Sequence, residues 1–301
     1  MVDHKKKQTT ETKLVAAVVA LLAFAVIIVI VASRGGNDNN GGKVEEGPWG
    51  DLTILKTTLT GDPYLNYYEV DGANELEDVT NPEKSVYLLI GVQKEINSSE
   101  LVTIGEYLDS GGHVIIADDG NLSERISNYT FGRTGGKVDL LGKRYLVDKL
   151  FSEPDGTDRG FEYNLSFIKG DTKEIEGRRF STLVHAPNGM TFTGPGRPIM
   201  WTTKMLTVVD MNNNWSIDND PPDMYLKFGD MGVEFNTGPG GGMITYISSS
   251  GLFTDNVFER FQNGDFVLSY IHSLIPDGGD VILDHSKQTT SYSPHTFIIP
   301  D

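Results

Sequence analysis

The sequence predicts an α/β domain with a mostly parallel sheet, and three observations support this fold class. Residues 85–90 and 113–117 are short, nearly continuous apolar runs, as expected of strands buried on both faces. Between them, residues 97–108 show helical spacing of apolar residues behind a capping-box pair, Asn97 and Glu100. A strand, a helix and a second strand in this order predict a parallel crossover.

The first element of the chain is an unbroken run of 20 uncharged, mostly apolar residues at 14–33. A helix of this length matches a bilayer core of about 30 Å. Four lysines precede the run and only Arg34 follows it closely, so we expect residues 1–13 to be cytoplasmic and the rest extracytoplasmic. The run exceeds the apolar core of a signal peptide, which favours a retained, single-pass signal anchor in the cell membrane.

A linker and a single domain follow this transmembrane helix. Residues 34–48 are rich in Gly and Asn and predict a flexible tether. Residues 49–286 then form the α/β domain, and residues 287–301 are a C-terminal tail. Within the domain we expect a first strand at 52–59.

The middle of the domain is predicted in less detail. Residues 121–129 predict a short helix with a capping-box pair in its first turn. Residues 132–235 mix Gly, Pro and short apolar runs, and we interpret them as an α+β insertion containing some helix and β-hairpins. A strand is expected near its end, at 205–209.

The last part repeats the α/β order. The glycine-rich stretch 238–242 predicts a hairpin turn, because it precedes a strand and lacks the Lys-Ser/Thr of a phosphate loop. A strand at 242–248, a helix at 256–275 and a strand at 281–283 follow. Asn263 and Gly264 interrupt the helix, so two helices are the alternative.

Composition limits the function. The net charge is −17, and residues 1–34 contribute five basic and two acidic side chains, which leaves −20 on the remainder. Such an acidic domain repels nucleic acid and anionic membrane surfaces and attracts cations. The chain has no cysteine, so it has no disulfide, no thiol nucleophile and no thiolate metal site.

Two stretches, 85–120 and 240–286, resemble an uncharacterised, archaeal-type family of prokaryotic membrane proteins. The shared features are a helix ending in Gly-Gly, a strand ending in acidic residues, and LFTDN at 252–256 before the last helix. That family has a class-I glutamine-amidotransferase-like ectodomain labelled a domain of unknown function. The resemblance implies a flavodoxin-like three-layer sandwich. Amidotransferases of this fold use a cysteine, so the resemblance concerns the scaffold alone.

A polar loop carries a candidate calcium site. Oxygen-bearing side chains alternate as in calcium loops, at Asp210, Asn212, Asn214, Ser216, Asp218 and Asp220. The glycine usual at the sharp bend is replaced by Trp215, and the twelfth position is Pro221. A polar turn between strands is therefore the alternative. We expect no other cofactor.

A second constellation contains a candidate nucleophile. Ser249 lies between a predicted strand and helix, where a nucleophile elbow would be, and Asp284 and His285 close the last strand. A Ser-His-Asp triad of Ser249, His285 and Asp284 is one interpretation. The leading glycine of the elbow is Ile247, so a serine cluster that caps a helix is favoured.

Other candidate residues are weaker. Asp118 and Asp119 end a predicted strand, where open α/β sheets bind ligands, although capping is the favoured role. Sequons for N-glycosylation occur at Asn97, Asn121, Asn128, Asn164 and Asn214.

These observations predict a membrane-anchored extracytoplasmic binding or scaffold module that acts with protein partners in a cell-envelope assembly. We favour a protein without enzymatic activity. A Ser-dependent hydrolase and a calcium-stabilised surface module are the alternatives.

Overall fold

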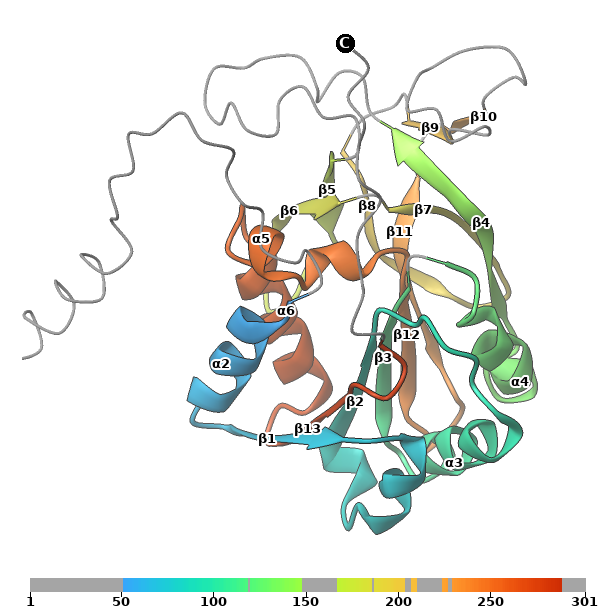
Figure 1. Cartoon of the computed structure of the whole chain (residues 1–301), viewed down its shortest axis with the longest axis vertical. Coiled ribbons are helices and arrows are strands. Elements are labelled where there is room, and N and C mark those ends of the chain that lie inside the picture. The colour runs from blue at the N-terminus through green and yellow to red at the C-terminus, as the bar shows by residue number, and fades with distance from the viewer. Residues whose placement is uncertain are drawn as a thin grey trace, which may run out of the picture. The chain divides into compact units, whose positions relative to one another are not determined.

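A computed structural model describes residues 51–118, 120–147, 167–185, 187–203, 207–209, 224–226 and 229–288. Over these residues the chain forms one 13-stranded sheet with helices on both faces (Figure 1). The strand order is β1-β13-β2-β3-β12-β11-β7-β4-β9-β10, and β8, β5 and β6 branch from β11.

One half of the sheet is parallel. Its four pairings join five strands, which are β1 (Leu65–Val70), β13 (Gly279–Asp284), β2 (Ser85–Ile90), β3 (His113–Ala117) and β12 (Met243–Ile247). All five strands therefore end at the same edge of the sheet.

The other half is antiparallel. Its strands are β4 (Lys137–Val147), β5 (Phe167–Thr172), β6 (Ser181–His185), β7 (Asn188–Thr193), β8 (Arg197–Thr202), β9 (Thr207–Val209), β10 (Met224–Leu226) and β11 (Asp230–Asn236). Their pairings with one another, and that of β11 with β12, are all antiparallel.

The predicted flavodoxin-like sandwich with a mostly parallel sheet is therefore wrong. Eight of the described strand pairings are antiparallel and four are parallel. The segment predicted as an insertion extends the same sheet instead of standing apart from it. No helix lies between residues 137 and 236 in the described part of that segment. Short antiparallel strands can be joined by tight turns and need no crossover helices.

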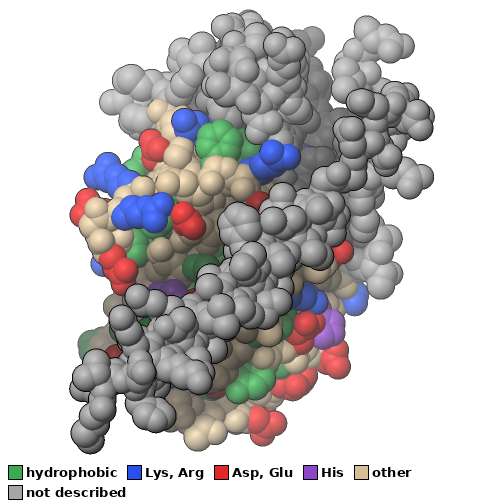
Figure 2. All heavy atoms as spheres, turned by 90° about the vertical axis from the view of Figure 1, so that its left-hand side faces the viewer, with side chains coloured by type: hydrophobic (Ala, Val, Ile, Leu, Met, Phe, Trp, Pro, Cys, Tyr) green, Lys and Arg blue, Asp and Glu red, His purple; other side chains and the backbone are tan. Residues whose placement is uncertain are grey.

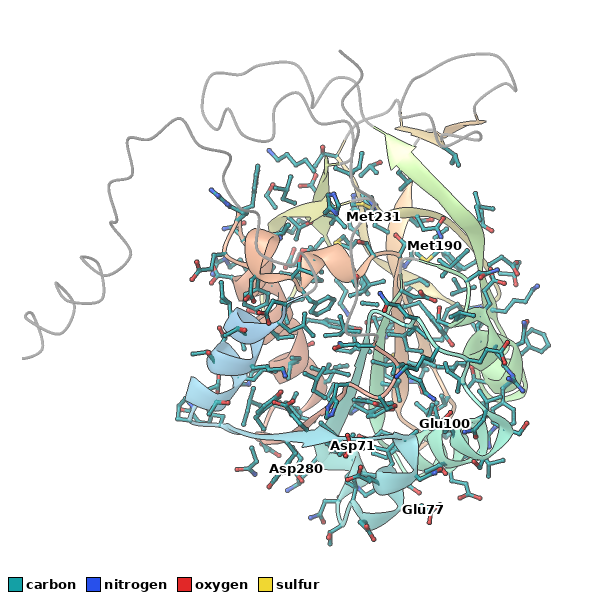
Figure 3. The ribbon with its side chains drawn as sticks, in the orientation of Figure 1. Asp71, Glu77, Glu100, Met190, Met231 and Asp280 are labelled. Atoms are coloured by element: carbon teal, nitrogen blue, oxygen red, sulfur yellow. The ribbon has the colours of Figure 1, made fainter. Side chains whose placement is uncertain are left out.

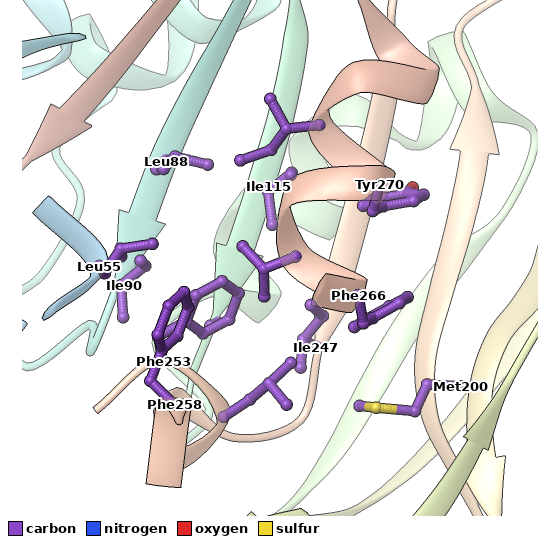
Figure 4. Close-up of a cluster of buried hydrophobic side chains, with 14 of the residues drawn as sticks. Leu55, Leu88, Ile90, Ile115, Met200, Ile247, Phe253, Phe258, Phe266 and Tyr270 are labelled. Carbon is purple, nitrogen blue, oxygen red and sulfur yellow. The ribbon is translucent and has the colours of Figure 1, made fainter. Parts of the chain in front are cut away.

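The helices divide between the two faces of the parallel half. Leu55 of α2, Phe258 of α5 and Phe266 of α6 pack on one face with Leu88 and Ile115 of the sheet (Figure 4). On the other face α3, α4 and the 3-10 helix η1 cover a second cluster. The helices are α2 (Thr53–Gly61), α3 (Ser98–Asp109), α4 (Glu124–Thr134), α5 (Asp255–Phe258) and α6 (Asn263–Leu274), with 3-10 helices η1 (Ala73–Asp78), η2 (Pro82–Lys84) and η3 (Ser250–Leu252).

Several predicted elements are confirmed. The crossover of β2, α3 and β3 is parallel, and Asn97 and Glu100 form the expected capping box. The interruption at Asn263 separates α5 from α6. The glycines at 238–242 turn the chain between β11 and β12, which pair antiparallel. Each of these features depends on residues close together in the sequence.

Two predicted elements need correction. The segment 52–59 is part of helix α2, because Leu52, Leu55 and Leu59 follow helical spacing and are all buried. The helix predicted at 121–129 begins later, at Glu124, and its N-cap residue Ser123 makes no side-chain cap.

The predicted transmembrane helix is not part of the described structure. Residues 14–33 and the linker 34–48 lie outside the described residues, as does the tail from 289 onward. Within the described part, no helix has both the length and the apolar character that a membrane span requires.

Candidate functional site

The carboxyl ends of the parallel strands form the first candidate site. After β3 the chain passes to α4, which packs on one face through Ile126, and after β12 it passes to α5 and α6 on the other face. Since β3 and β12 are neighbours, the crossover direction changes between them. Open α/β sheets bind ligands beside such a switch point.

Asp118 lies at this switch point and has a structural role. Its side chain is buried, and its two carboxylate oxygens accept hydrogen bonds from the main-chain N–H groups of Gly120 and Ser123, each at 2.8 Å. The carboxylate thereby fixes the loop that leads into α4. Capping, the favoured role in the sequence prediction, agrees with these contacts. Asp119 lies outside the described residues.

Ser249 has its hydroxyl group engaged on both sides. The Oγ atom donates to the carbonyl of His185 at 2.6 Å and accepts from the N–H of Gly251 at 2.9 Å. The side chain is fully buried and caps η3. This arrangement fits the capping interpretation, because a nucleophile needs an exposed hydroxyl and an adjacent base.

The two other members of the hypothetical triad end β13. The Asp284 carboxylate is buried and accepts hydrogen bonds from the Tyr87 hydroxyl and from the N–H of Ser286. Burial, and then the nearby Asp284, raises the pKa of Tyr87 well above its ordinary value, so the phenol stays protonated and donates.

His285 points to a different set of groups. Its Nε2 atom lies 2.8 Å from Oδ1 of Asp71, and its Nδ1 atom lies 3.8 Å from Oε2 of Glu69. Since β2 and β3 separate β13 from β12, three inter-strand spacings, or about 14 Å, separate the ends that carry His285 and Ser249. The structure therefore does not bring the predicted triad together.

Two buried polar atoms beside the switch point lack a hydrogen-bond partner within the described structure. They are Oγ of Ser248 and Oδ1 of Asn188. The two residues are neighbours, because the Asn188 N–H donates to the Ser248 carbonyl at 2.8 Å, and the Asn188 amide group also donates to the carbonyl of Gly120 at 3.3 Å. Both oxygens have almost no solvent-accessible surface, so they are not open to a ligand in this structure.

The segment after β13 crosses the carboxyl end of β2. Lys287 is buried, and its ammonium group contacts both carboxylate oxygens of Glu100, at 2.6 and 2.7 Å. The side-chain amide of Gln288 donates to the carbonyl of Ile90, the last residue of β2, at 2.9 Å. The N–H of Gln93 donates to the Lys287 carbonyl at 2.9 Å. The chain itself thus occupies this part of the edge.

The outer edge of β1 is the second candidate site. In the described part of the sheet β1 pairs only with β13. The carbonyls of Tyr64 and Val70 accept from the N–H groups of Gly279 and His285, so main-chain groups at even positions face β13. By the alternation of a strand, the main-chain groups of Tyr67 and Glu69 face outward.

Exposed aromatic and acidic side chains border this edge. Tyr64 and Tyr68 are 71% and 50% exposed. The segment 62–78 carries six acidic residues and no Lys, Arg or His. In Figure 3, Asp71 and Asp280 lie beside β1 and Glu77 lies just below it. Figure 2 shows acidic side chains concentrated in the lower right of the face turned to the viewer.

The sequence of β1 does not predict a strand by its apolar pattern. Only Leu65 is buried along it, so the apolar alternation that predicts a strand is nearly absent. The high density of tyrosine in 64–68 was the available signal, since aromatic residues favour strands.

The remaining predicted sites are only partly described. All six residues of the candidate calcium loop, Asp210 to Asp220, lie outside the described residues, as do Asn164 and Asn214. Asn97, Asn121 and Asn128 are exposed. Over the described residues, no group of three or more His, Asp or Glu side chains is arranged to hold a metal ion.

Comparison with known proteins identifies no family. No protein-family model and no curated protein matches the chain. Among solved structures, the domain described as "mmIFT52 N-terminal domain" aligns with 70% of this chain and 96% of its own length, at 11% identity and a TM-score of 0.46. Gan42B, a GH42 β-galactosidase from G. stearothermophilus, aligns with 65% of this chain and only 22% of its own length, at 11% identity and a TM-score of 0.31. These similarities are too low to support a functional argument.

Proposed function

We propose that this protein is a membrane-anchored, extracytoplasmic binding module of a cell-envelope assembly, and that an extended segment of a partner protein adds to the outer edge of β1. The observation that carries the proposal is the outer edge of β1, which pairs with no strand among the described residues and has exposed Tyr64 and Tyr68 beside it. A partner strand gains affinity from main-chain hydrogen bonds and specificity from the flanking side chains.

The geometry of β1 suits strand addition. The N–H and C=O groups of Tyr67 and Glu69 face away from β13, so a partner can pair with them without breaking the existing sheet. Proteins usually protect such an edge with charge, proline or a covering element. Charge is the protection here, because acidic residues surround the strand.

The contacts at the carboxyl edge favour a binding role over a catalytic one, because they engage the candidate catalytic side chains in structural hydrogen bonds. Asp118, Ser249 and Asp284 each hold a neighbouring main-chain group, and all three are buried. Their hydrogen bonds therefore stabilise the ends of the strands. The anchoring part of the proposal rests on the apolar run at 14–33.

Position-specific photocrosslinking tests the proposal. A photoreactive amino acid replaces Tyr68 on β1 or, as a matched control, Phe131 on α4, and both native side chains are 50% exposed. The full-length protein is irradiated in its native membranes. We expect an adduct of defined mass from position 68 and none from position 131. Equal labelling at both positions, or no adduct at 68, would overturn the proposal.

A further inference from the structure

We infer that the segment bound at β1 is basic: an extended strand of another protein whose lysine or arginine side chains face the acidic border of this edge. The inference rests on the proposed function, because it names the chemistry of the partner at the same site. It goes beyond that function by excluding neutral and acidic segments, and a second copy of this chain, as the occupant.

The charge around β1 is the first argument. Residues 62–78 contribute six negative charges and no positive one, and Asp280 of the neighbouring strand adds another beside Asn66, at 3.0 Å. Within the described structure, Lys56 is the one lysine that pairs with this border, at 2.8 Å from Glu69. Asp62 lies 2.9 Å from the His272 imidazole. The described structure pairs no lysine or arginine with the exposed carboxylates of Asp71, Glu75, Glu77 and Asp78, so these remain for the positive side chains of an added strand.

The contacts of Asp71 show the kind of side chain that lies against this border. Its side chain is 89% exposed, and its one described ionic contact is with the His285 imidazole at 2.8 Å. Glu69 contacts the other ring nitrogen at 3.8 Å, so the two carboxylates already flank a group that becomes a cation on protonation. The same pair lies at the end of β1, within reach of a side chain on an added strand.

The exposed tyrosines are the second argument. Tyr64 precedes β1 and Tyr68 lies within it, and at least half of the surface of each residue is exposed. Lysine and arginine are attracted to the faces of aromatic rings. The carboxylates and tyrosines that border β1 therefore favour the same kind of partner side chain.

Self-association is disfavoured by the same charges. Pairing of β1 with β1 of a second copy would bring two acidic segments together, each with six carboxylates, and like charges across paired strands are destabilising. The whole chain also carries a net charge of −17, which opposes association of two copies.

Peptide binding to the full-length protein in non-ionic detergent tests the inference. The probe is a fluorescent, amide-capped hexapeptide that alternates lysine and valine, and fluorescence anisotropy reports its binding. Its matched control replaces each lysine with glutamate. We expect saturable binding of the lysine peptide that weakens as salt is added, and at least about tenfold weaker binding of the glutamate peptide. Equal binding of the two peptides, or binding insensitive to salt, overturns the inference.

A separate control tests whether the peptide pairs with the main chain of β1. Two N-methylated forms of the lysine peptide carry methyl groups at alternate amides, so each form blocks one edge of the added strand. We expect one form to lose binding and the other to keep it, because only one edge faces β1. If both forms bind like the parent peptide, strand addition is excluded and charge alone holds the probe.

Variants of the protein test whether the lysine peptide binds at β1. Asp71→Asn removes one exposed charge at β1, and we expect it to weaken lysine-peptide binding about twofold to threefold. Glu174→Gln removes an equal charge from an exposed position outside this border and should leave binding unchanged. Equal effects of the two variants would contradict a site at β1.

Sedimentation experiments test the alternative occupant. A dimer that the lysine peptide does not dissociate would favour a second copy of this chain at β1 and overturn the inference.

The two proposals can fail separately. A crosslinked partner at position 68 whose bound segment is acidic or neutral would leave the binding function standing and overturn the inference. Absence of any position-specific adduct would overturn the function itself, even if the lysine peptide binds.

Discussion

Lys287 and Glu100 form a buried ion pair at the carboxyl edge. The Glu100 carboxylate also accepts from the N–H of Asn97 at 2.8 Å, as part of the capping box of α3. The Lys287 ammonium also donates to the carbonyl of Glu95 at 3.2 Å. The pair therefore ties the end of β13 to the start of α3, and its energetic importance depends on both charges being present.

We expect Lys287→Met to lower the free energy of unfolding by about 3 kcal/mol, because it leaves the Glu100 carboxylate buried without its cation. Urea denaturation measures this loss as a lower midpoint at an unchanged slope. The double variant Lys287→Met with Glu100→Gln should recover part of the stability, since the neutral amide still accepts from Asn97. A double variant less stable than the single one would contradict this account.

At the same scale, the sequence predicted where candidate residues lie but not what they contact. Asp118 and Ser249 follow strands that could be recognised locally, so their place at the carboxyl edge was predictable. The groups that decide their roles come from remote segments, such as the His185 carbonyl, 64 positions from Ser249. Tyr87 and Asp284, which bond each other, are 197 positions apart. No local pattern predicts such pairings.

The junction of β3 and β12 contains a histidine that must stay neutral. His113 begins β3, and its Nδ1 atom accepts a hydrogen bond from the N–H of Met243 at the start of β12, at 3.2 Å. Burial lowers the pKa of His113 below its ordinary value. A histidine protonated at Nδ1 cannot accept this bond, so protonation weakens the contact between the two strands.

We expect this contact to make stability depend on pH. Because the folded-state pKa is the lower one, the unfolded state binds the proton first, and the contribution of His113 is lost as pH falls below the ordinary histidine pKa of about 6.5. His113→Gln removes this titration while leaving His272 and His285 in place. The difference in unfolding free energy between wild type and variant should therefore shrink as pH falls. A difference independent of pH would contradict the prediction.

Two glycines give a matched test of packing between elements. A Cβ atom on Gly242 would lie 1.6 Å from the carbonyl oxygen of Gly112, so the residue before β12 and the turn between α3 and β3 approach main chain to main chain. Gly132 lies in α4 with no atom within 4 Å of such a Cβ. We expect Gly242→Ala to destabilise the domain by about 3 kcal/mol.

We expect Gly132→Ala, by contrast, to stabilise it by about 0.5–1 kcal/mol, because alanine loses less backbone entropy in a helix. Thermal unfolding followed by circular dichroism distinguishes the two outcomes. Equal and small effects of the two substitutions would show that the approach of β12 to the turn between α3 and β3 is loosely packed.

Elements with strong local signals were predicted, and the sheet that joins them was not. The capping box at Asn97 and the apolar strands 85–90 and 113–117 specify β2, α3 and β3 from neighbouring residues. Strand direction in the rest of the sheet depends on pairings between distant segments, such as β4 with β7 and β5 with β6. By their sequence pattern alone, the short strands of this half fit a separate insertion and an extension of the sheet equally well. Their pairing in the folded structure decides between these two arrangements.

At the scale of the whole molecule, charge and the N-terminal run predict how the protein is held in the cell. The first 34 residues are basic and apolar, and the remainder carries a net charge of −20. An acidic domain is repelled by anionic lipid surfaces. We therefore expect any attachment to a membrane to come from burial of the apolar run, which provides roughly 0.8 kcal/mol per buried methylene group.

Deletion of residues 1–48 tests this expectation directly. We expect the full-length protein to sediment with membranes and to resist extraction by high salt, because hydrophobic burial is insensitive to ionic screening. The deleted form should stay in the supernatant and unfold at the same urea midpoint as the detergent-solubilised full chain, since the described core begins at Leu52. External protease should digest the domain of the full-length protein in intact cells while an N-terminal tag stays protected. Salt extraction of the full chain would show attachment through charge or a partner instead.

Protection of the domain from external protease would place it on the cytoplasmic side. An extracytoplasmic partner could not reach the edge of β1 there.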